Sequence, residues 1–130
     1  MTATAFSSVS LDPPLVLVCV ITKNDGAELI PRNGVFAVNV LSVEQEAISN
    51  YFASSSRPRG RDAFSEVPHR EEATGAPIID GVAAYLDCRL VSTHLEGDHM
   101  IFIGEVAALG FDEEADPLLF HGGGYKRLAR

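Results

Sequence analysis

Short apolar runs separated by polar turns fill most of the chain, and this pattern predicts strands more than helices. Leu15–Ile21 is a continuous β-branched run, so we expect a strand that is buried on both faces. Val35–Leu41 has the same character and predicts a second buried strand. Ala83–Thr93 and Met100–Ala108, joined by a tight turn at Gly97, predict a β-hairpin. Both alternating faces of Met100–Ala108 are largely apolar, which indicates a barrel wall packed on two sides or a subunit interface.

Helical signals are fewer and shorter. A helix is predicted over Ala27–Arg32, ending at Asn33 and Gly34. Ser42 is a suitable N-cap for a second helix, and Gln45 three residues later completes a capping box. The apolar side chains expected on one side of that helix are Val43, Ala47, Ile48, Tyr51 and Phe52. At 130 residues the chain has room for one core, so we expect one mainly β domain with short helices over residues 1–130.

Charge and composition exclude several classes of partner. The formal net charge is −8, which argues against nucleic acid and anionic membranes, because phosphate backbones are bound mainly through Lys and Arg. The longest apolar run is far shorter than the roughly 20 residues that cross a bilayer, and no basic segment precedes it as in a signal peptide. Cys19 and Cys88 lie inside apolar runs, so we expect buried thiols, no metal site and a cytoplasmic protein.

Several motifs become informative when they are taken in order. The chain opens with MTATAFSSVSLDPP (1–14) and continues with FAVNVLS (36–42), YFASSS (51–56), GAPIIDGVAAYLDCRL (75–90), GDHMIFIGEV (97–106) and PLLFHGGGY (117–125). This ordered set resembles the flavin reductase-like, FMN-binding split-barrel family, in particular the small reductase components of two-component flavin monooxygenases. The resemblance runs over essentially the whole chain.

The resemblance implies a homodimeric split β-barrel that binds FMN, or FAD in its place, in a groove at the dimer interface. It also implies that NADH or NADPH gives a hydride to the flavin, and that reduced flavin passes to a partner monooxygenase. The cofactors carry this chemistry, while the protein holds the two rings together. Two alternatives stay open: a non-enzymatic FMN-binding protein of the same fold, and a truncated remnant with weak flavin affinity.

One departure from the family concerns the start of the chain. Family members usually have a helix and a first strand before the TATAFSSVSLDPP segment, whereas here that segment opens the sequence. We therefore expect an unpaired neighbouring strand edge, which either a longer gene product or dimerisation would cover.

The first segment is the candidate for contact with the flavin ring and ribityl chain. In the family it lies against the flavin, so the resemblance assigns this role to Thr2, Ala3, Thr4, Ala5, Ser7 and Ser8. The alternative is a disordered polar N-terminus. The turn Asn39, Val40 and Leu41 is implied to touch the ring edge, with Gln45 in reach, although Gln45 can equally serve only as a helix cap.

Two places compete for the flavin phosphate. Thr22, Lys23 and Asn24 directly follow the first buried strand, where related reductases contact ribityl or phosphate oxygens. The second place holds Arg57, Arg59 and Arg61, of which Arg61 with Phe64 corresponds best to the family pattern. Arginine suits phosphate because its guanidinium donates two parallel hydrogen bonds. The alternative for these arginines is a solvated loop.

His99 and Tyr125 are the candidates for the nicotinamide nucleotide. His99 follows the Gly97-Asp98 turn, and its position in the GDH motif is implied to lie near the exposed flavin face, as the catalytic and nucleotide-contacting residue. Tyr125 follows three glycines that would let it close over the same site. The alternatives are a surface histidine in a turn and a tyrosine that packs on the barrel.

Overall fold

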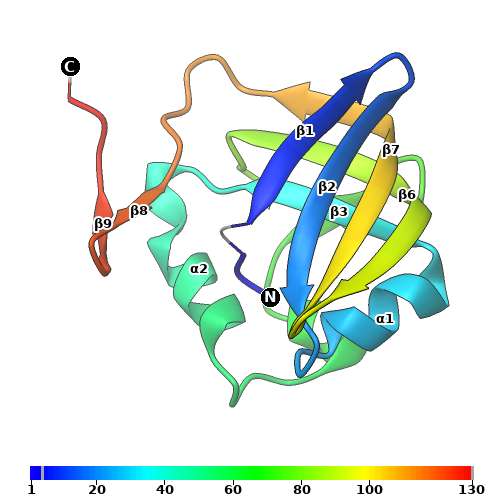
Figure 1. The fold of residues 1–130 in the computed structure, drawn as a ribbon. Coiled ribbons are helices and arrows are strands. Elements are labelled where there is room, and N and C mark those ends of the chain that lie inside the picture. Colours follow the sequence, from blue (N-terminus) through cyan, green and yellow to red (C-terminus); the bar gives the residue numbers. More distant parts are fainter. Residues whose placement is uncertain (4, 130) are drawn as a thin grey trace.

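Residues 1–3 and 5–129 are described by a computed structural model, built around an antiparallel sheet of five strands in the order β1-β2-β7-β6-β3. The sheet is strongly twisted, and it curls so that β3 crosses behind β2 and β1 (Figure 1). β1 has β2 as its single neighbour among the described residues, which agrees with the expected open edge. The strands are β1 (Phe6–Leu11), β2 (Pro14–Ile21), β3 (Val35–Val40), β6 (Ala84–Glu96) and β7 (His99–Phe111).

Within the described residues, two helices and two 3-10 turns connect these strands. α1 (Gly26–Asn33) ends at Gly34, whose φ of 71° is the left-handed conformation that glycine adopts without strain. A 3-10 turn (Val43–Gln45) leads into α2 (Glu46–Ala53), and a second one spans Gly60–Phe64. Neither helix, nor any other part of residues 1–3 and 5–129, forms a helix with the length and apolar character of a membrane span.

Two small sheets complete the fold. β4 (His69–Glu71) pairs with β5 (Pro77–Ile79), and β8 (Leu119–His121) pairs with β9 (Gly124–Lys126). The β8–β9 hairpin lies beside α2, away from the large sheet (Figure 1). These four strands have only three residues each and were not predicted, because so short a strand leaves no periodic pattern.

The prediction that Leu15–Ile21 is buried on both faces is wrong for the chain by itself. Val16, Val18 and Val20 face inward and pack with Phe36 and Phe102, whereas Ile21 is 41% exposed. Val35–Leu41 is likewise no fully buried strand, because β3 is an edge strand in which Phe36 is the buried side chain. The helix prediction fails at Ala47, which is exposed, while Phe52 is buried as expected.

The inner and outer faces of β2 and β7 follow from their pairing. We call Val16, Val18, Val20 and Phe102 the inner face, which is buried and packs against α1 and β3. We call the alternate positions the outer face; they are half-buried, and neither core cluster of the described residues includes them. The outer face consists of Leu15, Leu17 and Cys19 on β2 and Ile101 and Ile103 on β7.

The β6–β7 hairpin is confirmed and is longer than predicted. Its strands pair from Ala84↔Phe111 to Glu96↔His99, which leaves Gly97 and Asp98 as the turn. The register shifts between Asp87 and Cys88 and between Leu90 and Ser92, so that Ala107 and Val91 are extra residues in their strands. Such irregularities bend a strand, and here they let one hairpin form two walls of the curled sheet.

Candidate functional site

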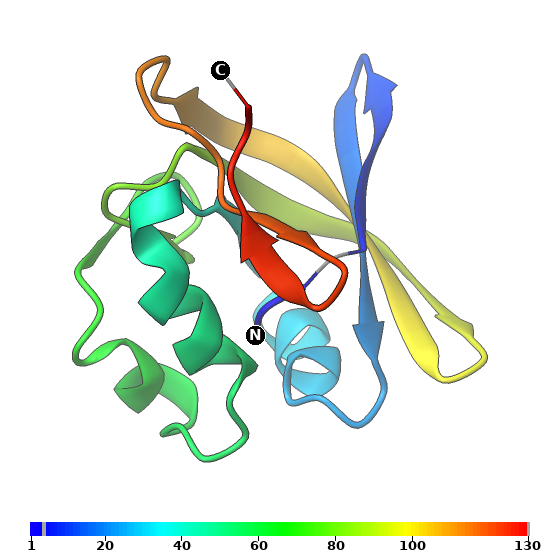
Figure 2. The ribbon, with the colours of Figure 1, turned by 90° about the vertical axis from the view of Figure 1, so that its left-hand side faces the viewer.

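Thr2 and Ala5, near the start of the chain, are hydrogen-bonded to α2 and β2 respectively. The hydroxyl of Thr2 donates to the carbonyl of Ser49 in α2 at 2.7 Å, and the carbonyl of Ala5 accepts from the Cys19 N–H in β2 at 3.1 Å. Both views place the N-terminal end between α2 and α1 (Figure 1 and Figure 2). Thr4 lies outside the described residues. The alternative of a disordered tail is wrong from Phe6 onward, because Phe6–Leu11 is a strand.

The side chains of this segment are small and accessible. Ser7 lies opposite Leu17, and Ser8 lies opposite Val16, so the two serines point to opposite faces of the sheet. The predicted contact residues that the structure describes are all exposed: Thr2, Ala3, Ala5, Ser7 and Ser8. Short side chains on an open edge strand allow a flat ligand to approach the backbone closely.

The turn after β2 meets the turn of the β6–β7 hairpin. The Thr22 N–H donates to the carbonyl of Asp98 at 2.9 Å, and His99 lies directly opposite Ile21 in the ladder. Asn24 accepts a hydrogen bond from the Gly26 N–H through its side chain at 2.8 Å. The Met1 sulfur and Asn24 Oδ1 both lie 3.2 Å from the place where a Cβ on Gly26 would stand. The N-terminal segment, the turn at 22–24 and His99 therefore share one region.

His99 is paired with the carboxylate beside it. His99 Nδ1 lies 2.7 Å from Asp98 Oδ1, and the His99 side chain is 45% exposed. The hydrogen bond from His99, and then its charge, lower the pKa of the Asp98 carboxyl. An ionised carboxylate can only accept, so Nδ1 carries the proton, and Nε2 of the neutral ring remains an acceptor.

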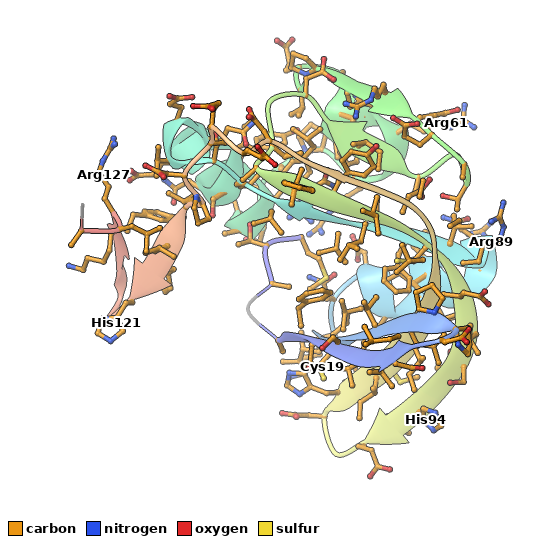
Figure 3. All side chains as sticks on the ribbon, turned by 90° about the horizontal axis from the view of Figure 1, so that it is seen from above. Cys19, Arg61, Arg89, His94, His121 and Arg127 are labelled. Atoms are coloured by element: carbon orange, nitrogen blue, oxygen red, sulfur yellow. The ribbon has the colours of Figure 1, made fainter. Side chains whose placement is uncertain are left out.

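The two predicted phosphate positions are joined by an ion pair. Arg59 Nη1 lies 2.7 Å from Asp25 Oδ2, which links the loop 54–60 to the turn that carries Lys23 and Asn24. Arg57 donates to the carbonyl of Ser54 at 2.6 Å. Arg61 makes no ion pair or hydrogen bond among the described residues, and its side chain points away at the outer edge of the molecule (Figure 3). Arg59, and not Arg61, is therefore the arginine that contacts the turn after β2.

Phe64 lies in the second core cluster. Its ring is 5.1 Å from that of Phe52 and 5.2 Å from that of His69. It is half-buried and packs with Ala63 and Val67. The structure thus separates Arg61 and Phe64 from the region that holds His99.

The polar atoms after β3 are already engaged within the chain. Asn39 donates to the Pro77 carbonyl at 3.2 Å and accepts from the Ile79 N–H at 2.9 Å. The carbonyl oxygens of Val40 and Leu41 accept from Ala83 and Leu118, each at 2.8 Å.

Gln45 is engaged in the same way. Its Oε1 accepts from the Ser42 N–H at 2.9 Å, which is the expected half of the capping box, and its Nε2 donates to Asp80 at 2.8 Å. These bonds give Gln45 and Asn39 structural roles.

Tyr125 lies on α2. Its hydroxyl donates to Ser49 Oγ at 2.8 Å and to Asn50 Oδ1 at 3.0 Å, and its ring is 5.4 Å from that of Phe120. Tyr125 and Thr2 thus meet at Ser49, which sequence reasoning missed. The available signal was a serine within the apolar stripe Ile48, Tyr51 and Phe52.

Comparison with known proteins gives matches that cover nearly the whole chain. The model of the "Flavin reductase like domain" family matches residues 1–129. An "NADH-dependent FAD reductase" of Streptomyces globisporus is 42% identical over 130 residues, covering 99% of this chain and 71% of that protein. The "Flavin-dependent monooxygenase, reductase subunit HsaB" of Rhodococcus jostii (strain RHA1) is 40% identical over 121 residues, which span 93% of this chain but 60% of HsaB.

A solved structure has a similar fold over nearly the whole chain. It is that of "Streptomyces globisporus C-1027 NADH:FAD oxidoreductase SgcE6 in complex with NAD and FAD fragments". It superposes with a TM-score of 0.90 at 38% identity, covering 99% of this chain and 76% of the other. Mainly β architecture with few short helices is thereby confirmed. This chain belongs to the flavin reductase-like domain family.

Proposed function

We propose that this chain is an NAD(P)H-dependent flavin reductase. The observation that carries the proposal is the shared region of the N-terminal segment, the turn at 22–24 and His99. Relatives named as NADH-dependent flavin reductases support the same function. Bound flavin would supply the hydride acceptor, and a nicotinamide nucleotide would supply the hydride.

The exposed segment fits a flavin ring and ribityl chain. The Ser8 hydroxyl can donate to a ribityl or ring oxygen, whereas the Thr2 and Ser7 hydroxyls already donate within the chain and can accept. The small side chains of the segment leave the backbone within reach. Arg59 and Lys23 fit the phosphate, because a phosphate can replace Asp25 as the partner of the guanidinium. The same fit accepts FMN or the diphosphate of FAD, and we propose FMN as the first ligand to test.

His99 orients the nucleotide. With Nδ1 held by Asp98, Nε2 is an acceptor, and the carboxamide N–H of nicotinamide is a matching donor. Holding that amide fixes the nicotinamide ring relative to the flavin, which is the protein's main contribution to a hydride transfer.

The proposal includes a split barrel that pairs with a second copy through the outer face. Five apolar side chains on β2 and β7 lie half-buried outside the core clusters, as expected of an interface. A reductase of this kind would deliver reduced flavin to a monooxygenase component. We also infer a cytoplasmic location, because Cys19 and Cys88 are free thiols.

Anaerobic stopped-flow absorbance tests the function directly. The purified protein is mixed with FMN or FAD and then with NADH or NADPH, and flavin bleaching is followed. Protein-dependent bleaching is expected, and its rate with each pair identifies the preferred flavin and nucleotide. Flavin that binds without bleaching would point to a flavin carrier, whereas no binding at all would indicate a remnant without the site.

Two substitutions test the residue roles. His99→Ala should raise KM for NADH about tenfold, as expected for one lost hydrogen bond to a bound ligand, and leave the FMN Kd nearly unchanged. His69→Gln, an exposed histidine outside the site, is the control.

Arg59→Gln should raise the FMN Kd about tenfold, while Arg61→Gln should have little effect. The reverse order for the arginines would return the phosphate role to Arg61.

A further inference from the structure

Ser49 connects two distant parts of the chain at one turn of α2. Its carbonyl accepts from Thr2 at 2.7 Å, and its hydroxyl accepts from Tyr125 at 2.8 Å. Thr2 and Tyr125 are 47 and 76 residues away in sequence. Ser49 is 4% exposed, so this polar contact is shielded from water and stronger than a surface contact.

The contact at Ser49 ties the β8–β9 hairpin to α2. The Tyr125 hydroxyl makes the sole hydrogen bonds that tie residues 119–126 to the rest of the described chain, at Ser49 and Asn50. Gly122 and Gly123 at the tip have φ of 60° and 80°, and Phe120 is 57% exposed. Backbone hydrogen bonds to Asp116 and from Leu118 fix the chain just before the hairpin, and beyond Leu118 the Tyr125 hydroxyl ties the hairpin to α2.

We propose that Ser49 is a positioning residue for the nicotinamide nucleotide, because it fixes Tyr125 beside the flavin-contacting segment that begins at Thr2. This inference rests on the proposed function. Ser49 itself touches neither ligand. It holds the hairpin against the same helical turn that holds the N-terminal segment, and so sets the distance between the two surfaces that would enclose the nucleotide.

The hydrogen bonds of Tyr125 predict which substitution should weaken NADH binding more. One phenolic proton serves two acceptors, so Ser49→Ala leaves Asn50 as a partner, whereas Tyr125→Phe removes both bonds. Ser49→Ala should raise KM for NADH about threefold and Tyr125→Phe about tenfold. The double variant should resemble Tyr125→Phe alone, because the serine acts through the tyrosine. The value of kcat and the FMN Kd should stay within about twofold in Ser49→Ala.

The experiment combines steady-state kinetics with direct binding on the full chain. KM, kcat, the FMN Kd and the NADH Kd (from NADH fluorescence) are measured for the unmodified protein, both single variants and the double variant. Tyr85→Phe is the control. Tyr85 lies on β6, and its hydroxyl donates to Glu72 Oε1 at 3.3 Å, so the change removes a tyrosine hydroxyl elsewhere in the fold. Hydrogen exchange of residues 119–126 should quicken in Ser49→Ala and Tyr125→Phe but not in Tyr85→Phe.

The outcomes separate this role from the reductase function. Unchanged KM and Kd for NADH in Ser49→Ala, or effects of the two substitutions that simply multiply in the double variant, would overturn the positioning role. Loss of FMN affinity and thermal stability without a change for NADH would show a purely structural serine. If the unmodified protein binds NADH but does not bleach flavin, the reductase function fails, and the NADH Kd series alone decides the role of Ser49. Absence of NADH binding overturns both.

Discussion

The inner and outer faces of β2 and β7 have nearly the same residue types but different surroundings. Val18 and Phe102 on the inner face are 8% and 0% exposed, in a cluster that includes side chains from α1 and β3. Leu17 and Ile103 on the outer face are paired across the same two strands and remain half-buried. Apolar side chains left outside a core at this density are typical of a surface that another molecule covers.

The difference explains why the continuous apolar run Leu15–Ile21 led to a wrong burial prediction. A strand that is apolar on both faces must be covered on both, but the second cover need not come from its own chain. In this molecule the chain supplies one cover, and we assign the other to a second copy. Substitutions on the two faces should therefore have different effects.

The largest expected effect is the loss of Phe102 from the inner face. Phe102→Ala should lower the free energy of unfolding by about 3–5 kcal/mol, because Phe102 is 0% exposed and its removal leaves a cavity. Ile103→Ala, the neighbour on the outer face, should cost under about 1.5 kcal/mol in dilute protein, since its surroundings are open. Urea unfolding followed by circular dichroism measures both, and equal losses would refute the distinction between the faces.

A second effect on the inner face comes from Gly104. A Cβ at this position would lie 2.5 Å from Cζ of Phe36, so Gly104→Ala should destabilise the fold by about 1–3 kcal/mol through overpacking. Adding Phe36→Leu should recover part of this loss because it removes the clashing ring. No recovery in the double variant, measured by the same unfolding experiment, would show that the ring is not the cause.

The outer face should control association. Ile101→Glu places a charge in the middle of the proposed interface and should convert dimer to monomer in sedimentation velocity experiments. Leu95→Glu is the matched control, because Leu95 is apolar and 64% exposed on β6 but lies outside the outer face. A monomeric unmodified protein at tens of micromolar, or a dimer that survives Ile101→Glu, would place the interface elsewhere.

The smallest effect concerns the two cysteines, which lie on different faces. Burial, and then the charge of Asp87, raise the pKa of the Cys88 thiol from 9.0 to about 11, so it stays protonated and enclosed at neutral pH. Iodoacetamide should therefore modify Cys19, which Figure 3 places on β2, and reach Cys88 only after unfolding. The rate at Cys19 should fall as protein concentration rises, because the proposed second copy would cover it.

The same shift gives a pH dependence. A thiol whose pKa is raised by folding stays protonated in the native protein while it ionises in the unfolded chain, so stability declines as pH rises from about 9 towards 11. Cys88→Ala should remove part of that decline in urea unfolding at pH 9.0 and above. Mass spectrometry of the alkylated protein identifies which thiol reacts at each pH.

Much of the sheet could be predicted because its strands are long and apolar. Leu15–Ile21, Val35–Leu41 and the hairpin at Gly97 all correspond to strands in the structure. The capping role of Gln45 was likewise visible as a spacing of three residues from Ser42. β1 was missed because hydroxyl-rich residues such as Ser7 and Ser8 give no apolar alternation, and an open edge strand needs none.

The site could be predicted only in part. The motif order indicated the N-terminal segment and His99. No sequence pattern says that Arg59 rather than Arg61 meets the turn at 22–24, because both belong to one short arginine-rich stretch of the sequence. The partners of Asn39 come from residues 38 and 40 positions away, and such long-range hydrogen bonds have no local signal. The serine within the apolar stripe of α2 marked Ser49 as unusual, but its partners Thr2 and Tyr125 are likewise distant in sequence.

The extra residues Val91 and Ala107 have a consequence for how this domain can change in evolution. Without Val91, Leu90 would still pair with Gly104 and Ser92 with Ile103, so a one-residue deletion there would preserve every partner and straighten the strand. Deleting a residue of a regular ladder, such as Val18 of β2, would instead turn each following side chain of its strand to the opposite face. Insertions and deletions should therefore collect at these two positions in related sequences, where they adjust the curvature of the wall and hence the width of whatever it encloses.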